Sequence, residues 1–174
     1  MTESEMSHTA APADRAALTF AIEQFLYHEA WLLDSSQMEA WVDLFSEQGV
    51  YWIPSSRTQS DMLNEVSIVL EDKALLRVRM QRLGHANAHA VIPMPATVHA
   101  VSNVQLINDS ARASTELTVR SIVTLREQRN HQSRSLNGYA THTLVQTETG
   151  FNIVRKRVDL IQCGTAFAPI SMLL

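Results

Sequence analysis

The sequence predicts an α+β fold in which a strongly curved sheet wraps around helices that come first in the chain. Helical periodicity marks the N-terminal part, and long strands fill the C-terminal part. Helices followed by long antiparallel strands are typical of α+β domains. The clearest alternation lies in residues 114–127, where one face carries Leu117, Val119, Val123 and Leu125. Because such strands must curve for helices to cover one face, we expect a cone with an apolar pocket at its mouth.

The first elements are an acidic tail and a long helix. Residues 1–13 are rich in Ser, Thr, Ala and Glu without periodicity, which predicts a disordered tail. Asp14 is a suitable N-cap, and the apolar positions after it predict a helix that ends near Leu33. A length of 174 residues favours one domain. Residues 14–174 are therefore expected to form a single cone-shaped domain.

A short helix and a short strand should follow. Ser36 is the expected N-cap of a helix over residues 37–45, and Gly49 occupies the C′ position expected after that helix. The segment "VYWIP" then predicts a strand that Pro54 closes.

The rest of the chain supplies one more helix and the long strands. Residues 66–70 predict a strand, and residues 71–84, which begin with acidic side chains and end in glycine, predict a helix. Residues 85–97 contain two prolines and are expected to be irregular. Long strands are expected at residues 98–108, 114–127, 138–147 and 151–163.

Composition excludes several classes of function. The net charge is −4 and no stripe of Lys and Arg alternates with aromatic side chains, which argues against nucleic-acid binding. The N-terminal residues lack the apolar core of a signal peptide, and no apolar run is long enough to span a membrane. The single cysteine, Cys163, allows no intrachain disulfide and fits a reducing compartment. We therefore expect a cytoplasmic protein that binds neither nucleic acid nor membrane.

Motifs for metal and nucleotide chemistry are missing from the sequence. A Rieske cluster takes two cysteines and two histidines, whereas the chain has one cysteine. His85 and His89 are four residues apart, but they form no H-E-x-x-H motif, and no acidic residue stands at the short spacing of a facial triad. No glycine-rich phosphate loop is present either. We therefore assign no catalytic, cofactor-binding or metal-binding residue from motifs.

Glu29 is the most informative single residue, because it lies in the middle of an apolar helix face. That face is formed by Leu18, Ile22, Phe25, Leu32 and Leu33. A carboxylate in such a place is costly unless it is paired or protonated. The favoured interpretation is a buried ion pair with an arginine. The cations available for it are Arg77, Arg79, Arg82, Arg155, Lys156 and Arg157.

An acid–base site is the alternative interpretation. The cone pocket could be lined by Glu29, Tyr51, His99 and His142, and burial would then raise the pKa of Glu29 toward neutrality. That arrangement predicts a stand-alone dehydratase or isomerase that uses Glu29, Tyr51 and His99. A third hypothesis is a module that binds a small apolar ligand without any chemistry.

Two segments near the end of the sequence are candidates for contacts. Lys156 should share a strand face with Val154, Val158 and Leu160, either in a solvated rim or in an inter-subunit salt bridge. Residues 164–174, "GTAFAPISMLL", have almost no polar side chain. This tail should therefore fold back onto its own core or pack on another subunit.

Four segments, within a similarity that spans roughly residues 18–174, match parts of one known family. "FLYHEAWLLDSSQMEAWVDLFSEQGVYWIP" has that family's opening helix with Glu-Ala and Leu-Leu-Asp, then its Trp-containing helix and aromatic strand. "VSIVLEDKALLRVRMQRL" is similar to its strand, acidic turn and Arg-bearing helix. "HAVSNV" is similar to its His-x-x-x-Asn-Val segment, and "FNIVRKRVDL" to its last strand. The chain thus resembles the small, or beta, subunits of aromatic-ring-hydroxylating dioxygenases. An arginine that often precedes the histidine of the third segment is absent here, where the sequence reads "PATVHAV".

The resemblance implies a fold and a partner. The fold would be the cone shared with the nuclear transport factor two and scytalone dehydratase families. The partner would be a large (alpha) subunit that holds a Rieske two-iron two-sulfur cluster and a mononuclear Fe(II). Electrons would come from NAD(P)H through a reductase, and the substrate would be an aromatic compound, such as an aromatic acid, in bacterial catabolism. Three large and three small subunits would assemble, with a small-subunit trimer among the contacts.

The resemblance also implies a structural role for this chain, with no catalytic, cofactor or metal residue of its own. Glu29 would be held by an internal partner and would set the helix against the sheet. The residues expected in structural ion pairs or subunit interfaces are Glu29, Arg77, Arg79, Arg82, His99, Asn103, Arg155, Lys156 and Arg157.

Overall fold

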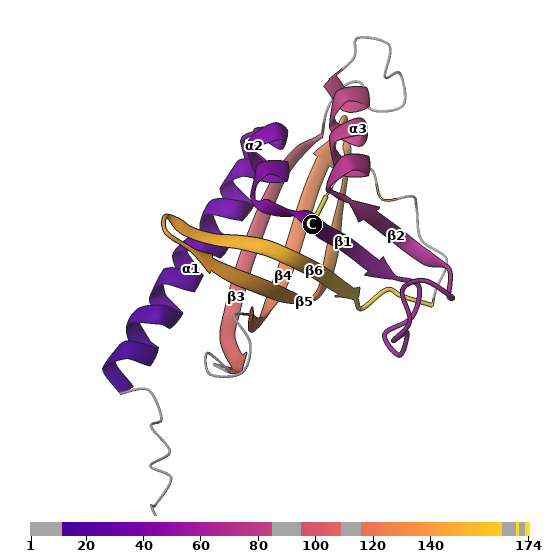
Figure 1. Cartoon of the computed structure of the whole chain (residues 1–174). Helices are drawn as coiled ribbons and strands as arrows, with labels where there is room; N and C mark the ends of the chain where they lie inside the picture. The colour runs from indigo at the N-terminus through magenta and orange to yellow at the C-terminus, as the bar shows by residue number, and fades with distance from the viewer. Residues whose placement is uncertain (1–11, 85–94, 109–115, 165–169, 171–172) are drawn as a thin grey trace, which may run out of the picture.

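A computed structural model describes residues 12–84, 95–108, 116–164, 170 and 173–174. Most of the expected tail (residues 1–11), His85, His89 and the expected turn after residue 108 lie outside this part of the chain. The described residues form three helices and one six-stranded sheet (Figure 1). Helices and long strands occur in the predicted order.

The helices differ from the predicted ones mainly at their ends. They are α1 (Pro12–Asp34), α2 (Met38–Asp43) and α3 (Lys73–Gly84). The first begins two residues before Asp14, and Pro12 occupies its first position, where a proline costs no hydrogen bond. The predicted Ser36 cap is wrong: Gln37 is the N-cap of α2, with no side-chain capping bond, and Ser36 has a φ of 58°.

The first strand begins inside the segment predicted as the second helix. That strand, β1 (Phe45–Pro54), contains Gly49, so the predicted C′ position for this glycine is wrong. A Cβ on Gly49 would lie 2.7 Å from the carbonyl oxygen of Ile153, so the close approach of the neighbouring strand explains the glycine. Ile153 also donates its backbone N–H to Leu44 at 2.8 Å. Pairing with a distant strand therefore ends the helix two residues earlier than local signals indicate.

The sheet is mixed, with the order β2-β1-β6-β5-β4-β3. β1 pairs in parallel with β6, and every other neighbouring pair is antiparallel. The remaining strands are β2 (Ser67–Asp72), β3 (Ala96–Asn108), β4 (Glu116–Arg129), β5 (Gln132–Thr147) and β6 (Gly150–Leu160). β5 begins six residues before the predicted strand, because a tight turn at Asn130, with a φ of 53°, joins it directly to β4.

The core lies between the helices and the concave face of the sheet. In Figure 1, α1 runs beside β3 at one edge, whereas α2 and α3 lie together at one end of the molecule. The predicted alternation of β4 is confirmed, since its apolar face is buried. The largest fully buried side chains are Trp41, Trp52, Tyr51 and Phe45. Three of them, Trp41, Phe45 and Tyr51, are in edge-to-face contact, with ring centroids 5.0 and 5.7 Å from that of Trp41.

Candidate functional site

Glu29 is buried and is held by three other elements. Its Oε1 accepts hydrogen bonds from Lys156 Nζ at 2.7 Å and from Trp41 Nε1 at 3.2 Å. Its Oε2 lies 3.1 Å from His142 Nε2. The four residues come from α1, α2, β5 and β6, and we call them the Glu29 cluster. The carboxylate thus joins the helices to the central strands.

Among the six cations considered for Glu29, Lys156 is the partner that the structure shows. It is buried inside the chain and belongs neither to a solvated rim nor to a bridge between subunits. A β-bulge lies just before it: Ile153 pairs with Leu144 and Arg155 with Thr143, so Val154 is the extra residue. Lys156 shares the inward face with Val158 and Leu160, as predicted, whereas the bulge turns Val154 off that face.

The electrostatics of Glu29 contradict an acid–base role. Burial raises its pKa, but the charges of Lys156 and His142 and their hydrogen bonds lower the pKa more, to well below the ordinary value of 4.5. A general base at neutral pH needs a raised carboxylate pKa. Glu29 instead stays ionised and engaged, so the raised pKa expected for the acid–base alternative is wrong.

The predicted arginines do not supply the partner of Glu29. Arg79 pairs with Glu71, and Arg157 forms two hydrogen bonds with Asp159, at 2.7 and 2.8 Å. Arg77 lies 3.5 Å from Asp43 at the surface. Arg155 is exposed on β6, and the side chain of Arg82 lies outside the described part of the chain. The expectation of an arginine partner is corrected to a lysine.

Asn103 marks a second bulge. It has a φ of 52° and is exposed, within the register shift of β3 between Ser102 and Gln105. Asparagine tolerates this left-handed conformation better than most residues do. The Asn of the His-x-x-x-Asn-Val segment therefore has a local backbone reason.

His99 and Tyr51 contact the last two residues of the sequence instead of an open pocket. His99 Nε2 lies 2.9 Å from the carbonyl oxygen of Leu173, and Leu174 donates its backbone N–H to the hydroxyl of Tyr51 at 3.1 Å. Burial raises the pKa of Tyr51 above its ordinary value of 10.0, so the hydroxyl stays neutral. For these two leucines, folding back onto the chain's own core is the arrangement that the structure shows.

Three residues of these networks escaped sequence reasoning. The sequence gives no sign that Trp41 donates to Glu29, or that Asp34 accepts from the backbone N–H of His99 at 2.8 Å. Lys73 is buried and donates to the carbonyl oxygen of Phe45 at 2.5 Å and to Glu47 at 3.0 Å. A signal for Lys73 existed, because a cation at the first position of a helix opposes the macrodipole and indicates a specific partner.

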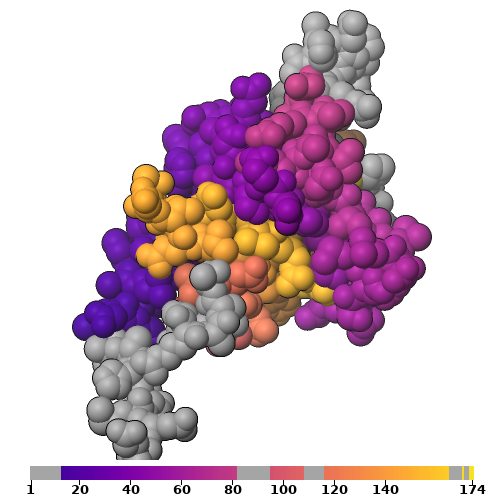
Figure 2. Space-filling view, in the orientation of Figure 1, coloured from indigo at the N-terminus to yellow at the C-terminus, as the bar shows by residue number. Residues whose placement is uncertain are grey.

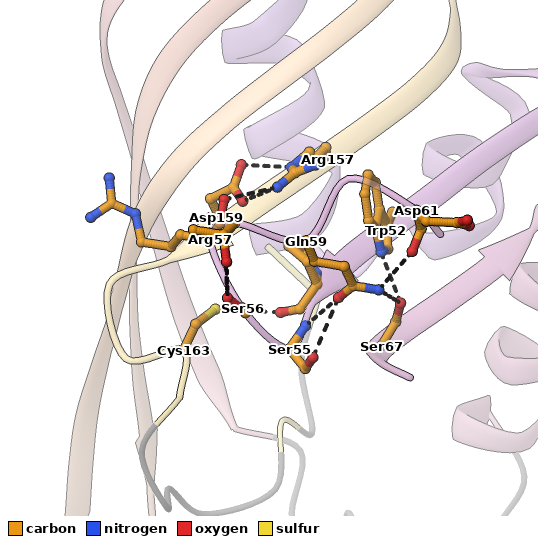
Figure 3. A network of polar contacts seen from close by, with 12 residues as sticks. Trp52, Ser55, Ser56, Arg57, Gln59, Asp61, Ser67, Arg157, Asp159 and Cys163 are labelled. Atoms are coloured by element: carbon orange, nitrogen blue, oxygen red, sulfur yellow. Dashed lines mark hydrogen bonds and ion pairs between the residues drawn. The ribbon is translucent and has the colours of Figure 1, made fainter. Parts of the chain in front are cut away.

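A second polar network orders the segment between β1 and β2 (Figure 3). Gln59 is buried, and its Oε1 accepts from the backbone N–H of Ser55 at 2.9 Å. Its Nε2 donates to two backbone carbonyls of the same segment and to the hydroxyl of Ser67. The segment thus has a defined shape, and it exposes Leu63 and Val66.

Three aromatic side chains lie along the outer face of α1. Phe20, Tyr27 and Trp31 are 63%, 43% and 64% exposed. At about 100° per residue they fall within about 40° of one another. We call them the α1 aromatic stripe.

On the face shown in Figure 2, the β5–β6 hairpin runs between α1 and the segment before β2.

No group of three or more His, Cys, Asp or Glu side chains in the described ranges could hold a metal ion. The donor set of the whole chain does not fit a Rieske cluster either, since Cys163 is its one cysteine. A pocket of about 260 Å³ lies between α2 and α3 and includes Asp43, Arg77 and Met80. Among the described helices, none combines the length and apolar character that crossing a bilayer requires.

Comparison with known proteins identifies the family. Residues 28–165 match the model of the ring hydroxylating beta subunit. The small oxygenase component of the p-cumate 2,3-dioxygenase system of Pseudomonas putida is 31% identical over 141 residues, which are 80% of this chain and 77% of that protein.

Solved structures agree with this result. The beta subunit of benzoate 1,2-dioxygenase from Burkholderia mallei is 25% identical, with a TM-score of 0.64 over 88% of this chain and 92% of that one. An NTF2-like protein from Novosphingobium aromaticivorans, 17% identical, shares the fold with a TM-score of 0.59 over 92% of this chain and 94% of that one. The predicted α+β cone is therefore confirmed, and the chain belongs to the family of ring-hydroxylating dioxygenase beta subunits.

Proposed function

We propose that this chain is the structural, non-catalytic small subunit of an aromatic-ring-hydroxylating oxygenase, and that it has no activity alone. The observation that carries the proposal is the Glu29 cluster. In it, the buried carboxylate of Glu29 is hydrogen-bonded to Trp41, His142 and Lys156. Tyr51 and His99 are likewise engaged by backbone groups of the same chain. Glu29, Tyr51 and His99, the residues of the acid–base alternative, thus make contacts that stabilise the fold.

The redox chemistry belongs, in this proposal, to a large subunit with a Rieske cluster and a mononuclear Fe(II). A single cysteine cannot provide the thiolates of such a cluster. NAD(P)H would deliver electrons to the large subunit through a reductase. Since p-cumate and benzoate, in the names of the relatives, are aromatic acids, an aromatic acid is the substrate class we propose.

Assembly with other subunits is supported by the surface of the chain. Exposed aromatic side chains are enriched at protein–protein interfaces, and the α1 aromatic stripe presents three of them. Arg155 and Arg77 remain interface candidates because both are exposed. We propose a cytoplasmic complex of three large and three small subunits, in which the small subunits also contact one another.

Co-expression with a large oxygenase subunit of the same family tests the proposal. We expect both polypeptides to purify in equal amounts and to hydroxylate an aromatic acid when a reductase and NAD(P)H are supplied. The iron-free small subunit alone should convert no substrate. Turnover by the isolated chain, or a large subunit that is fully assembled and active without it, would overturn the proposal.

A further inference from the structure

The peptide group between Leu173 and Leu174 is held at both of its polar atoms. Its carbonyl oxygen lies 2.9 Å from His99 Nε2, and its N–H donates to the Tyr51 hydroxyl at 3.1 Å. The C=O and N–H of a trans peptide point in opposite directions, so His99 and Tyr51 contact the amide from opposite sides. Both leucine side chains are buried in the core. One amide and two apolar groups are thus recognised together.

Asp34 orients the histidine of this site. Its Oδ1 lies 2.6 Å from His99 Nδ1, and its Oδ2 accepts from the backbone N–H of His99 at 2.8 Å. A carbonyl oxygen only accepts, so the contact with Leu173 takes its hydrogen from His99 Nε2. Asp34 therefore directs an N–H of the ring at the carbonyl of Leu173. Side chains that bind a ligand precisely are usually oriented by such a second partner.

The site is assembled from distant parts of the fold. Tyr51 lies on β1 and His99 on β3, and three strands separate these two in the sheet. Asp34 is the last residue of α1. Residues 173–174 therefore bridge two sides of the curved sheet, and Figure 1 shows the end of the trace beside β1. This is the region where the sequence predicts an apolar pocket.

We propose that Tyr51, His99 and Asp34 form a peptide-binding site, which Leu173 and Leu174 occupy from within the same chain. Its ligand class is a short peptide with bulky aliphatic side chains on both sides of one amide. An ester would lose the hydrogen bond to Tyr51, because it lacks the N–H. When residues 173–174 are removed, the site accepts such a peptide from solution.

The test is complementation by a peptide added from solution. In a variant that lacks residues 173 and 174, thermal unfolding should occur at a lower temperature than in the full chain. N-acetyl-leucyl-leucine should raise the midpoint of this variant by mass action and leave that of the full chain unchanged. The matching depsipeptide, with an ester in place of the central amide, should have at least about fivefold weaker affinity. A variant as stable as the full chain, no response to the peptide, or an equal response to the ester overturns the proposal.

A second measurement decides the matter if the shortened chain does not fold. In the full chain, Tyr51→Phe removes the acceptor of the Leu174 N–H and leaves the ring in place. Hydrogen exchange of that amide should accelerate about fivefold or more. Tyr139→Phe, a change of the same kind on the exposed part of β5, should leave the exchange of Leu174 unaltered. Unchanged exchange in Tyr51→Phe contradicts the proposed site.

Discussion

Lys156 and Glu29 are 127 residues apart in the sequence, yet Lys156 Nζ lies 2.7 Å from Glu29 Oε1. Each side chain is only 4% exposed. Water cannot compensate either charge if the other is removed, because both lie inside the fold. The pair therefore links the first helix to the last strand, and its loss should be felt by the whole domain.

Replacing Lys156 by Met should destabilise the chain strongly, because Glu29 would keep its charge without its nearest cation. Removing one partner of a buried ion pair costs about 3–5 kcal/mol. The free energy of unfolding from urea denaturation measures the loss. The neighbouring Arg155→Met should change it by no more than about 0.5 kcal/mol, since Arg155 is exposed.

A double variant separates charge pairing from packing. Lys156→Met combined with Glu29→Leu removes both charges, and buried ion pairs replaced by apolar groups are often neutral in stability. We expect the double variant to be more stable than Lys156→Met alone. Losses that simply add would contradict an interaction between the two charges.

The free energy of unfolding should fall at acidic pH because Glu29 becomes protonated. Its pKa in the folded chain lies well below the ordinary value of 4.5, because Lys156 and His142 outweigh the effect of burial. The unfolded chain therefore takes up this proton first as the pH falls. The contribution of Glu29 is present above about pH 4.5 and is lost progressively below it.

Glu29→Gln is the variant that reveals this contribution. It lacks the titrating group, so its free energy of unfolding should fall less steeply than that of the natural chain between about pH 5 and pH 3. Urea denaturation at a series of pH values compares the two slopes. Equal slopes would show that Glu29 has the same pKa in both states.

The order of elements and the buried face of β4 could be predicted because both depend on local periodicity. Leu117 and Val119 alternate with polar residues, and this pattern survives in the sheet. The start of β1 could not be predicted, because Phe45 and Gly49 follow a helical signal and only the pairing with Ile153 overrides it. Long-range pairing leaves no trace in a short window of sequence.

The candidate site was predictable only in part, for a similar reason. Glu29 stands out because its charge lies on an apolar helix face. Lys156 is one of six candidate cations, and the face that it was predicted to share with Val158 and Leu160 is the buried one. Which of the six cations contacts Glu29 could not be chosen from the sequence, because the choice depends on how α1 packs against the sheet. The bulge that removes Val154 from the inward face has no clear sequence signal either.

Replacing Asn103 by alanine should destabilise the chain more than replacing it by glycine. Its φ of 52° lies in the left-handed region, where a Cβ without polar compensation costs roughly 1–2 kcal/mol. Asn103→Ala should therefore lower the free energy of unfolding by about that amount, while Asn103→Gly stays closer to the natural chain. Ser102→Ala, at the exposed neighbouring position, is the control. Equal losses for alanine and glycine would mean that the asparagine side chain, and not the backbone, matters.

The α1 aromatic stripe should matter for assembly and not for folding. Trp31 and Phe20 are more than half exposed, so Trp31→Gln and Phe20→Gln should change the free energy of unfolding by no more than about 0.5 kcal/mol. Burial of aromatic side chains at an interface often supplies a large share of its binding energy. We therefore expect both variants to reduce the amount of small subunit that purifies with a tagged large subunit. His28→Gln, exposed on the same helix but outside the stripe, should purify with the large subunit as the natural chain does. If complex recovery is the same for all three variants, the subunit contact lies on another surface of the cone.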